Sequence, residues 1–230
     1  VTRGVARSDH GVSQRMGAAR RTRAGGALVG ELLAGIHAQR ACRRFDPDSK
    51  VPDSDVEHML AAAVHAPSAE NTQPWTFIVV RDERNRALLA AWWTETWNAG
   101  GGDFVRQSVE DKVLVADLEF GFSKGGFAAA PVVVVVCADT DRVPEIHAPS
   151  SIYPAVQNLL LAAADFGYGS CLTTGLTTFG VDRVRELLQL PQNLIPMAAV
   201  YVGLPARKLS PPRRRPATSV TYRERFGTPW

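Results

Sequence analysis

The chain has 230 residues, of which 45% are hydrophobic and 21% are charged. This mixture is typical of a globular domain and excludes disordered, collagen-like and small disulfide-rich proteins. The formal net charge of +3 is unevenly distributed, because residues 1–30 carry +5 and residues 207–230 carry +6, which leaves −8 on residues 31–206. Basic ends on an acidic body, without a helix-turn-helix, zinc-finger or RNA-binding signature, do not predict a nucleic-acid partner.

The cysteine and apolar patterns exclude further classes. Cys42, Cys137 and Cys171 lie far apart and form no C-x-x-C pair, which argues against a disulfide framework and a Cys-ligated metal. The longest apolar run, residues 128–138, contains Pro131 and is much shorter than the roughly 20 residues of a membrane helix. No histidine has the spacing of a metal ligand or a catalytic triad. We therefore expect a cytoplasmic protein with no membrane partner and no resident metal.

The order of expected elements indicates an α+β domain. Residues 1–27 have no apolar period and are expected to form a basic arm. Helical spacing of apolar residues begins at Leu28, and Asp53 is placed to cap a second helix. Further helices are predicted at 83–98, 103–122, 150–166 and 182–189, with a flexible glycine break at 100–102. Buried strands are predicted at 75–80, 132–136 and 197–202. These elements give one domain over 28–206, a small sheet covered by helices, followed by an extended Arg-rich segment over 207–230.

A polar segment, residues 67–75, joins the second helix to the first strand. Prolines at both ends restrict its backbone, and Ser68, Asn71 and Gln73 stand between them. A side-chain amide offers both donors and an acceptor, which suits a heterocycle whose edge alternates C=O and N–H. The same composition is also typical of a turn that bonds its own backbone, and composition alone favours that interpretation.

Three arginines, Arg40, Arg43 and Arg44, follow the first helix within five residues. Their guanidinium groups repel one another unless an anion or carboxylates lie among them. Guanidinium forks match phosphate oxygens, and if the helix continues, Arg40 and Arg44 lie one turn apart and can bind one group. The alternative is a solvated basic end of a helix.

Two later segments are also candidates. Residues 167–175 are glycine-rich and follow a helix, so they match neither the dinucleotide nor the Walker motif and are expected to form a loop close to a flat ligand. The alternative is a helix stop followed by a turn. Arg213, Arg214 and Arg215 form a second cationic cluster. Two arginine clusters and an amide-bearing loop together suit a heterocycle that carries a phosphate.

The combined motifs resemble the FMN-dependent nitroreductase family, of the NAD(P)H-dependent, oxygen-insensitive type found in actinobacteria. The resemblance rests on R-A-C-R-R-F-D at 40–46, A-P-S-A-E-N-T-Q-P-W-T-F-I-V-V at 66–80, I-Y-P-A-V-Q-N-L-L-L-A-A at 152–163 leading into G-Y-G-S-C, A-A-V-Y-V-G-L-P-A at 198–206, and the Arg-rich end. It covers residues 28–230. It implies an α+β fold with a small, mostly antiparallel sheet, and an intertwined homodimer with FMN at the interface.

The resemblance also implies site residues. The FMN phosphate would be held by Arg40, Ala41, Cys42, and Arg43 or Arg44, together with Arg213 and Arg215 from the C-terminal segment. The flavin and ribityl would be approached from the other subunit by Pro67, Ser68, Ala69, Asn71 and Gln73. Thr174 and Gly175 would face the flavin near N5. Many members have an arginine six residues before the phenylalanine and a serine two residues after that arginine. Here Gln39 lies six before Phe45, and that hydroxyl is replaced by Ala41 or Cys42.

The implied activity is hydride transfer from NADPH or NADH, through flavin N5, to a nitroaromatic or quinone-like acceptor in a ping-pong cycle. No side chain is then expected to act as a catalytic acid, base or nucleophile, because the cofactor carries the chemistry. Trp93 and Phe120 are candidate walls of the acceptor pocket, although helix packing is the favoured role for the tryptophans. The alternatives are a flavin-destructase or dehalogenase branch of the family, or a flavin-binding sensor or store without turnover.

Overall fold

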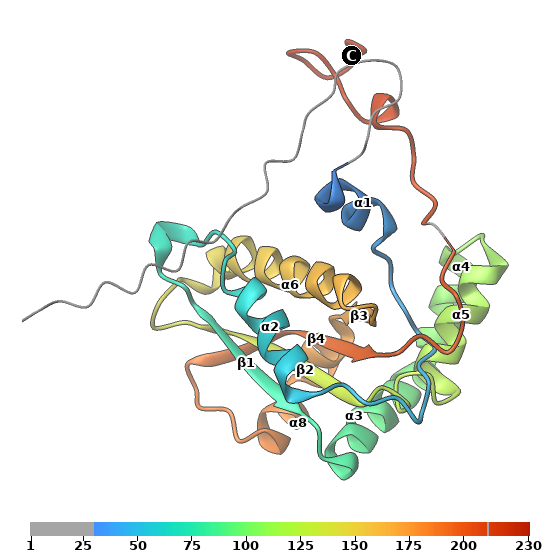
Figure 1. Cartoon of the computed structure of the whole chain (residues 1–230), viewed down its shortest axis with the longest axis vertical. Helices are drawn as coiled ribbons and strands as arrows, with labels where there is room; N and C mark the ends of the chain where they lie inside the picture. Colours follow the sequence, from blue (N-terminus) through green and yellow to red (C-terminus); the bar gives the residue numbers. More distant parts are fainter. Residues whose placement is uncertain (1–29, 211) are drawn as a thin grey trace, which may run out of the picture.

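A computed structural model describes residues 30–210 and 212–230 (Figure 1). Its centre is a four-stranded sheet in the order β1-β2-β4-β3, in which every neighbouring pair is antiparallel. The strands are β1 (Trp75–Val80), β2 (Val132–Asp139), β3 (Gly169–Thr173) and β4 (Leu194–Gly203). The predicted α+β class and antiparallel sheet are confirmed. Strand β2 is buried along seven of its eight residues, as its unbroken apolar sequence predicted.

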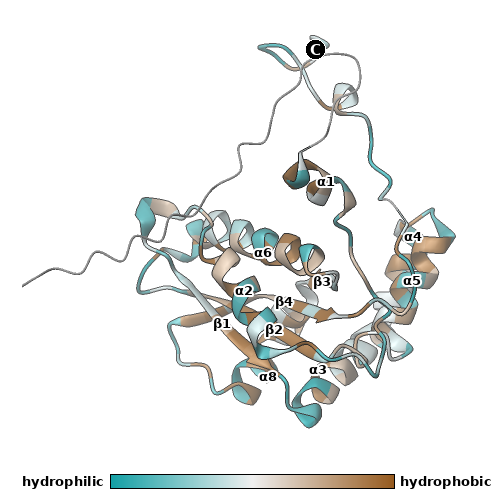
Figure 2. Ribbon diagram, in the orientation of Figure 1, coloured by the Kyte–Doolittle hydropathy of each residue, from teal (hydrophilic) through white to brown (hydrophobic). Residues whose placement is uncertain are grey.

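Helices cover both faces of the sheet. On one face, α2 (Asp53–Ala63) and α6 (Ala148–Asp165) pack against Val132, Val134 and Val136. On the other face, α3 (Glu83–Thr96), α7 (Gly175–Phe179) and α8 (Val181–Leu187) pack against Val133 and Val135. Successive side chains of a strand point to opposite faces, so the valine run of β2 supplies both cores. Figure 2 shows the resulting apolar colour along the central strands.

The region between β1 and β2 departs from the sequence prediction. The glycines at 100–102 were expected to break the chain, and Gly100, with φ of +116°, does interrupt the helical backbone inside the turn Trp97–Gly101 that leads into α4 (Gly102–Ser108). A second break, which the sequence did not predict, lies between α4 and α5 (Lys112–Ser123). Asp111 begins α5, because its carboxylate accepts hydrogen bonds from the amides of Val113 and Leu114 at 2.9 and 3.2 Å.

Two local predictions were wrong. Residues 169–173 were expected to be a loop, but they pair with β4 as the edge strand β3. Gly167, with φ of +81°, does end the preceding helix as expected. Asp53 was expected to cap α2, but Pro52 occupies the cap position and no side chain caps this end. The Asp53 carboxylate pairs instead with Arg81 at 2.7 Å.

The first helix, α1 (Glu31–Ala38), forms where helical spacing predicted it, but it buries no residue in the protomer. Its apolar stripe faces outward, with Leu32 71%, Leu33 50% and Ile36 45% exposed. Leu28 and the expected basic arm lie outside the described residues.

The C-terminal segment is extended, as expected, and rises away from the sheet beyond α1 (Figure 1). It contains one 3₁₀ turn, Ala217–Ser219, and a short bridge between Tyr222 and Pro229. Within residues 30–210 and 212–230, no helix is both long and apolar enough to cross a membrane.

Candidate cofactor-binding site

The arginine segment is extended and lies against the edge of the sheet. Ala41 forms a bridge with Ser170 of β3, and the Cys42 amide donates to the Ser170 carbonyl at 2.8 Å. The Asp46 amide donates to the Leu204 carbonyl at 2.9 Å, so the segment also follows the chain that leaves β4. Helix α1 ends at Ala38, so the expected helical pairing of Arg40 with Arg44 was wrong.

Cys42 faces the core in this extended segment. It is fully buried, and its thiol donates to the Arg44 carbonyl at 3.3 Å. Burial raises the pKa of the Cys42 thiol. The side chain of Cys42 is therefore placed for packing and its amide is bonded to Ser170, so Ala41 and Arg43, but not Cys42, line the cavity.

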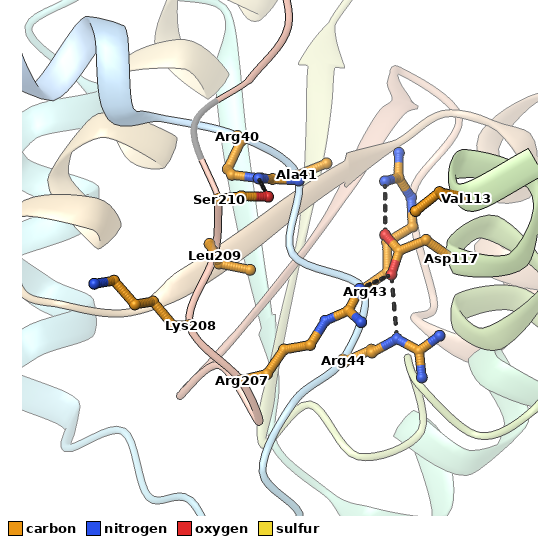
Figure 3. Close-up of a pocket in the computed structure, with 10 residues that line it drawn as sticks. All are labelled: Arg40, Ala41, Arg43, Arg44, Val113, Asp117, Arg207, Lys208, Leu209 and Ser210. Atoms are coloured by element: carbon orange, nitrogen blue, oxygen red, sulfur yellow. Dashed lines mark hydrogen bonds and ion pairs between the residues drawn. The ribbon is translucent and has the colours of Figure 1, made fainter. Parts of the chain in front are cut away.

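Three guanidinium groups meet at one carboxylate of α5 (Figure 3). Asp117 pairs with Arg43 Nη1 at 3.4 Å, Arg44 Nε at 3.2 Å and Arg207 Nη2 at 2.8 Å. Arg40 lies beside this cluster and donates to Ser210 Oγ at 2.9 Å. The sequence required an anion or carboxylates among these arginines, and the fold supplies a carboxylate from a distant helix.

This cluster lines a cavity of about 420 Å³ that opens between α5, the arginine segment and the chain after β4. Its lining is strongly cationic: Arg40, Arg43, Arg207, Arg213 and Arg214 face only two carboxylates, Asp111 and Asp117, with Ala41, Val113, Leu114, Ser210 and Pro212. The Nε atoms of Arg40 and Arg43 are buried, and neither has a hydrogen-bond partner among the residues that the structure describes. Unpaired buried donors are costly, so the cavity fits an anion with several acceptor oxygens.

The second arginine cluster is only loosely attached to this cavity. Arg213 pairs with Asp111 at 3.3 Å, but 92% of its side chain is exposed. Arg214 donates to the carbonyl of Arg213, and Arg215 is exposed. The structure thus brings Arg213 to the cavity, whereas Arg207, which the sequence prediction left out, lies inside it.

The amide-bearing loop has a preformed, unusual backbone. Glu70, Asn71 and Gln73 all adopt positive φ, at +46°, +56° and +50°. Ser68 Oγ accepts from the Gln73 amide at 3.0 Å, and the Ala69 amide donates to Ser151 Oγ at 3.1 Å. Positive φ is uncommon outside glycine and stores strain. Ser68 fixes the turn, while the side chains of Asn71 and Gln73 remain at the surface.

The loop and the arginine cavity are not brought together within one protomer. The loop lies before β1, beside the start of α6, whereas α5 stands on the opposite side of the sheet (Figure 1). None of the residues 67–75 lines the cavity.

Gly175 begins α7 directly after the exposed Thr174. A Cβ at Gly175 would overlap the ring of Trp93, so only glycine fits this position. Trp93 is buried and packs against Phe122, with ring centroids 4.4 Å apart. Within the protomer Trp93 is thus packed beneath Gly175, which agrees with the favoured packing role, and its place in an acceptor pocket stays a prediction.

Phe120 is half-buried, and one of its contacts is with the arginine segment. The Arg44 guanidinium lies 3.7 Å from its ring centroid, which is a cation–π contact. Phe120 thus supports the arginine segment, and its place in an acceptor pocket stays a prediction.

The model of the nitroreductase family matches residues 36–204. The chain belongs to this family. An Archaeoglobus fulgidus protein that carries the name NADH dehydrogenase/NAD(P)H nitroreductase is 33% identical to this chain. The match covers 76% of this chain and 86% of the relative. A Desulfovibrio desulfuricans nitroreductase solved in complex with FMN is 27% identical and superposes with a TM-score of 0.64, covering 86% of this chain and 99% of that one. Oxidized iodotyrosine deiodinase bound to FMN and 3-iodo-L-tyrosine is 25% identical, with a TM-score of 0.65 and the same coverage.

The family match spans the arginine segment, the amide loop and Gly175, but it ends before the C-terminal segment. The cavity residues that the sequence prediction missed come from two places. Arg207 and Ser210 lie in that segment, where the high arginine content was the available signal. Asp117 and Asp111 lie in a region read as one helix, where nothing in the sequence marked either carboxylate as part of a site.

Proposed function

We propose that this nitroreductase-family chain is an FMN-dependent oxidoreductase. The observation that carries the proposal is the cationic cavity, in which Arg40 and Arg43 each keep a buried Nε donor without a partner in the described chain. The phosphate of FMN supplies the acceptor oxygens that these donors lack. In this arrangement Arg40, Arg43 and Arg207 hold the phosphate, and the exposed Arg213 and Arg215 close over it.

When bound, the flavin would supply the redox chemistry, accepting hydride at N5 from NAD(P)H and passing it to a flat, electron-poor acceptor such as a nitroaromatic or a quinone. The chain's own part is to bind and orient. The backbone at Ala41 would line the phosphate end, because the hydrogen bond from the Cys42 amide to Ser170 holds this segment against β3. The backbone at Thr174 and Gly175 would face the ring, and Trp93, packed directly against Gly175, would fix the position of this turn.

The amide loop completes the site from a second copy of the chain. Two observations support this assembly. The loop and the cavity lie on opposite sides of the protomer, so one chain cannot present both to the same small molecule. The apolar stripe of α1 is exposed, and an exposed apolar face of this kind marks an interaction surface. Pro67, Ser68, Ala69, Asn71 and Gln73 would then approach the flavin across the homodimer interface, and the C-terminal segment would cross to the partner.

The test begins with the visible spectrum of the purified protein. We expect a yellow protein whose flavin absorbance bleaches with NADPH or NADH under nitrogen and recovers when a nitroaromatic or a quinone is added. Comparing the two nucleotides establishes the preferred reductant. A protein that binds FMN but does not bleach with either nucleotide would instead be a flavin store. A protein that cannot be reconstituted with FMN would contradict the proposal.

Reductive dehalogenation is the second candidate, and the likeness to iodotyrosine deiodinase is the observation that favours it. The discriminating measurement uses the reduced protein with a halogenated phenol and with a nitroaromatic in parallel. Release of halide at a rate that matches flavin reoxidation would support dehalogenation. Reoxidation by the nitroaromatic alone would exclude it.

A further inference from the structure

Asp117 has an unusual environment for a surface-helix carboxylate. Its side chain is only 14% exposed, and it contacts three guanidinium groups from two distant segments. One negative charge faces three positive charges, with Arg40 close by as a fourth. The cluster therefore carries a net positive charge that one carboxylate cannot balance.

The side of α5 that carries Asp117 also carries the residues that fix the position of its carboxylate. Asp117, Phe120 and Gly121 are three and four residues apart, so they share one side of the helix. Gly121 allows the Arg43 side chain to pack directly against the helix, since a Cβ there would lie 3.0 Å from Arg43 Cβ. Arg44 stacks on Phe120. These contacts hold the Asp117 carboxylate at the cavity wall in a fixed position.

Asp117 and an incoming phosphate would share the same donors. Arg43 bonds Asp117 through Nη1, while its buried Nε faces no partner among the described residues. Arg207 bonds Asp117 through Nη2 and also lines the cavity. A carboxylate this close to a bound phosphate repels it, yet without any anion the three guanidiniums repel one another.

We propose that Asp117 is an internal counter-anion: it holds Arg43, Arg44 and Arg207 together while no phosphate is bound, and it opposes the phosphate once that group enters. Asp117 is thus a positioning residue, which acts on the ligand through the arginines. This inference rests on the proposed phosphate site. The inference predicts that the stability of the fold and the binding of phosphate are linked. Removal of the Asp117 carboxylate lowers the stability only while no phosphate takes its place among the arginines.

The test compares D117N with E119Q and the wild type. Glu119 lies on the same helix and pairs with Lys124 at 3.2 Å outside the cavity, so E119Q makes the same change in charge without touching the arginines. Thermal unfolding is measured at low ionic strength in a buffer free of phosphate, then with inorganic phosphate and separately with FMN. We expect D117N to unfold roughly 5 °C lower than the wild type without an anion, and to recover most of this difference with either ligand. The apparent Kd for inorganic phosphate should be about fivefold lower in D117N.

Other results would overturn the inference. If D117N lowers the unfolding temperature equally with and without an anion, Asp117 is a packing residue. If phosphate raises the unfolding temperature of D117N less than that of the wild type, the carboxylate preorganises the site instead. If D117N does not fold, the double variant D117N/R207Q replaces it, because it removes one charge of each sign. We expect this double variant to fold and to unfold at a temperature closer to that of the wild type in the phosphate-free buffer. If the double variant does not fold either, the counter-anion role is refuted. A wild type that gains no stability from FMN would instead refute the proposed function, whatever D117N does.

Discussion

The arginine cavity and the amide loop both contain polar segments that the sequence singled out, but they are built differently. The cavity is assembled from three segments, and the bonds to Asp117 join residues 73 to 90 positions apart. The amide loop is shaped mainly by its own residues, through Ser68 and three residues with positive φ, with one long-range bond from the Ala69 amide to Ser151. A locally built loop can be presented to a second molecule, whereas a cavity made of distant segments depends on the whole fold. The following changes test this contrast.

The largest effect is expected from disrupting the proposed dimer, which would separate the amide loop of one copy from the cavity of the other. Leu33 and Ile36 lie on the exposed stripe of α1, and two carboxylates there would oppose burial against a second copy. We expect L33E/I36E to be monomeric by analytical ultracentrifugation and to bind FMN roughly 100-fold more weakly, since the loop would no longer reach the cavity. An unaltered dimer that binds FMN normally would contradict the proposed interface.

The next effect concerns the cavity itself. Replacing Arg43 removes the buried Nε donor and one charge of the cluster. A hydrogen bond to a charged group contributes about 1.5–3 kcal/mol, so R43Q should weaken FMN binding by about 10- to 100-fold in a fluorescence titration. The exposed Arg84 on α3 provides the control, and R84Q should bind FMN as the wild type does.

A smaller effect is expected in the loop. The Asn71 backbone amide donates to the Ser68 carbonyl at 3.1 Å, a bond that N71A keeps, whereas its exposed side chain only accepts, at Oδ1, from Gln73 Nε2 at 3.4 Å. We expect N71A to weaken FMN binding by about fivefold, because one neutral hydrogen bond is lost, without changing the oligomeric state. If N71A also dissociated the protein, the loop would act in assembly rather than in binding.

Gly175 tests the packing beneath the flavin-facing turn. In G175A the new methyl group would overlap the ring of Trp93, and overpacking of this kind costs about 1–3 kcal/mol. Denaturant unfolding without FMN measures this cost. The neighbouring T174A should change the free energy of unfolding by less than about 0.5 kcal/mol, because Thr174 is exposed.

The smallest effect concerns the three buried thiols. Burial raises the pKa of Cys137 and Cys171 to about 12 and also raises the pKa of Cys42, so all three remain protonated at pH 8. A thiol reagent should therefore modify the native protein only slowly, and all three cysteines rapidly after unfolding. Rapid modification of Cys42 alone would show that the arginine segment opens away from β3.

Much of the fold was predictable, because the strands with strong signals are also the buried ones. The valine run of β2 shows its burial directly, and β1 and β4 are rich in β-branched and aromatic residues. Strand β3 was not predictable, because its small residues, Gly169 and Ser170 among them, give no alternation of polar and apolar side chains. Gly169 is required there for a tertiary reason, since Cys42 lies where a Cβ would be.

The sequence by itself determined the elements whose cause is local: the main strands, most helices, the stop at Gly167, and the polar loop between its prolines. It also determined that the arginines at 40–44 need an anion, because like charges within a few residues repel wherever the chain goes. Only the tertiary structure decided that Asp117 supplies it, that Arg207 joins the cluster, that Trp93 is buried beneath Gly175 and that α1 is left uncovered. Each of these depends on contacts between segments far apart in the chain, for which local spacing carries no signal.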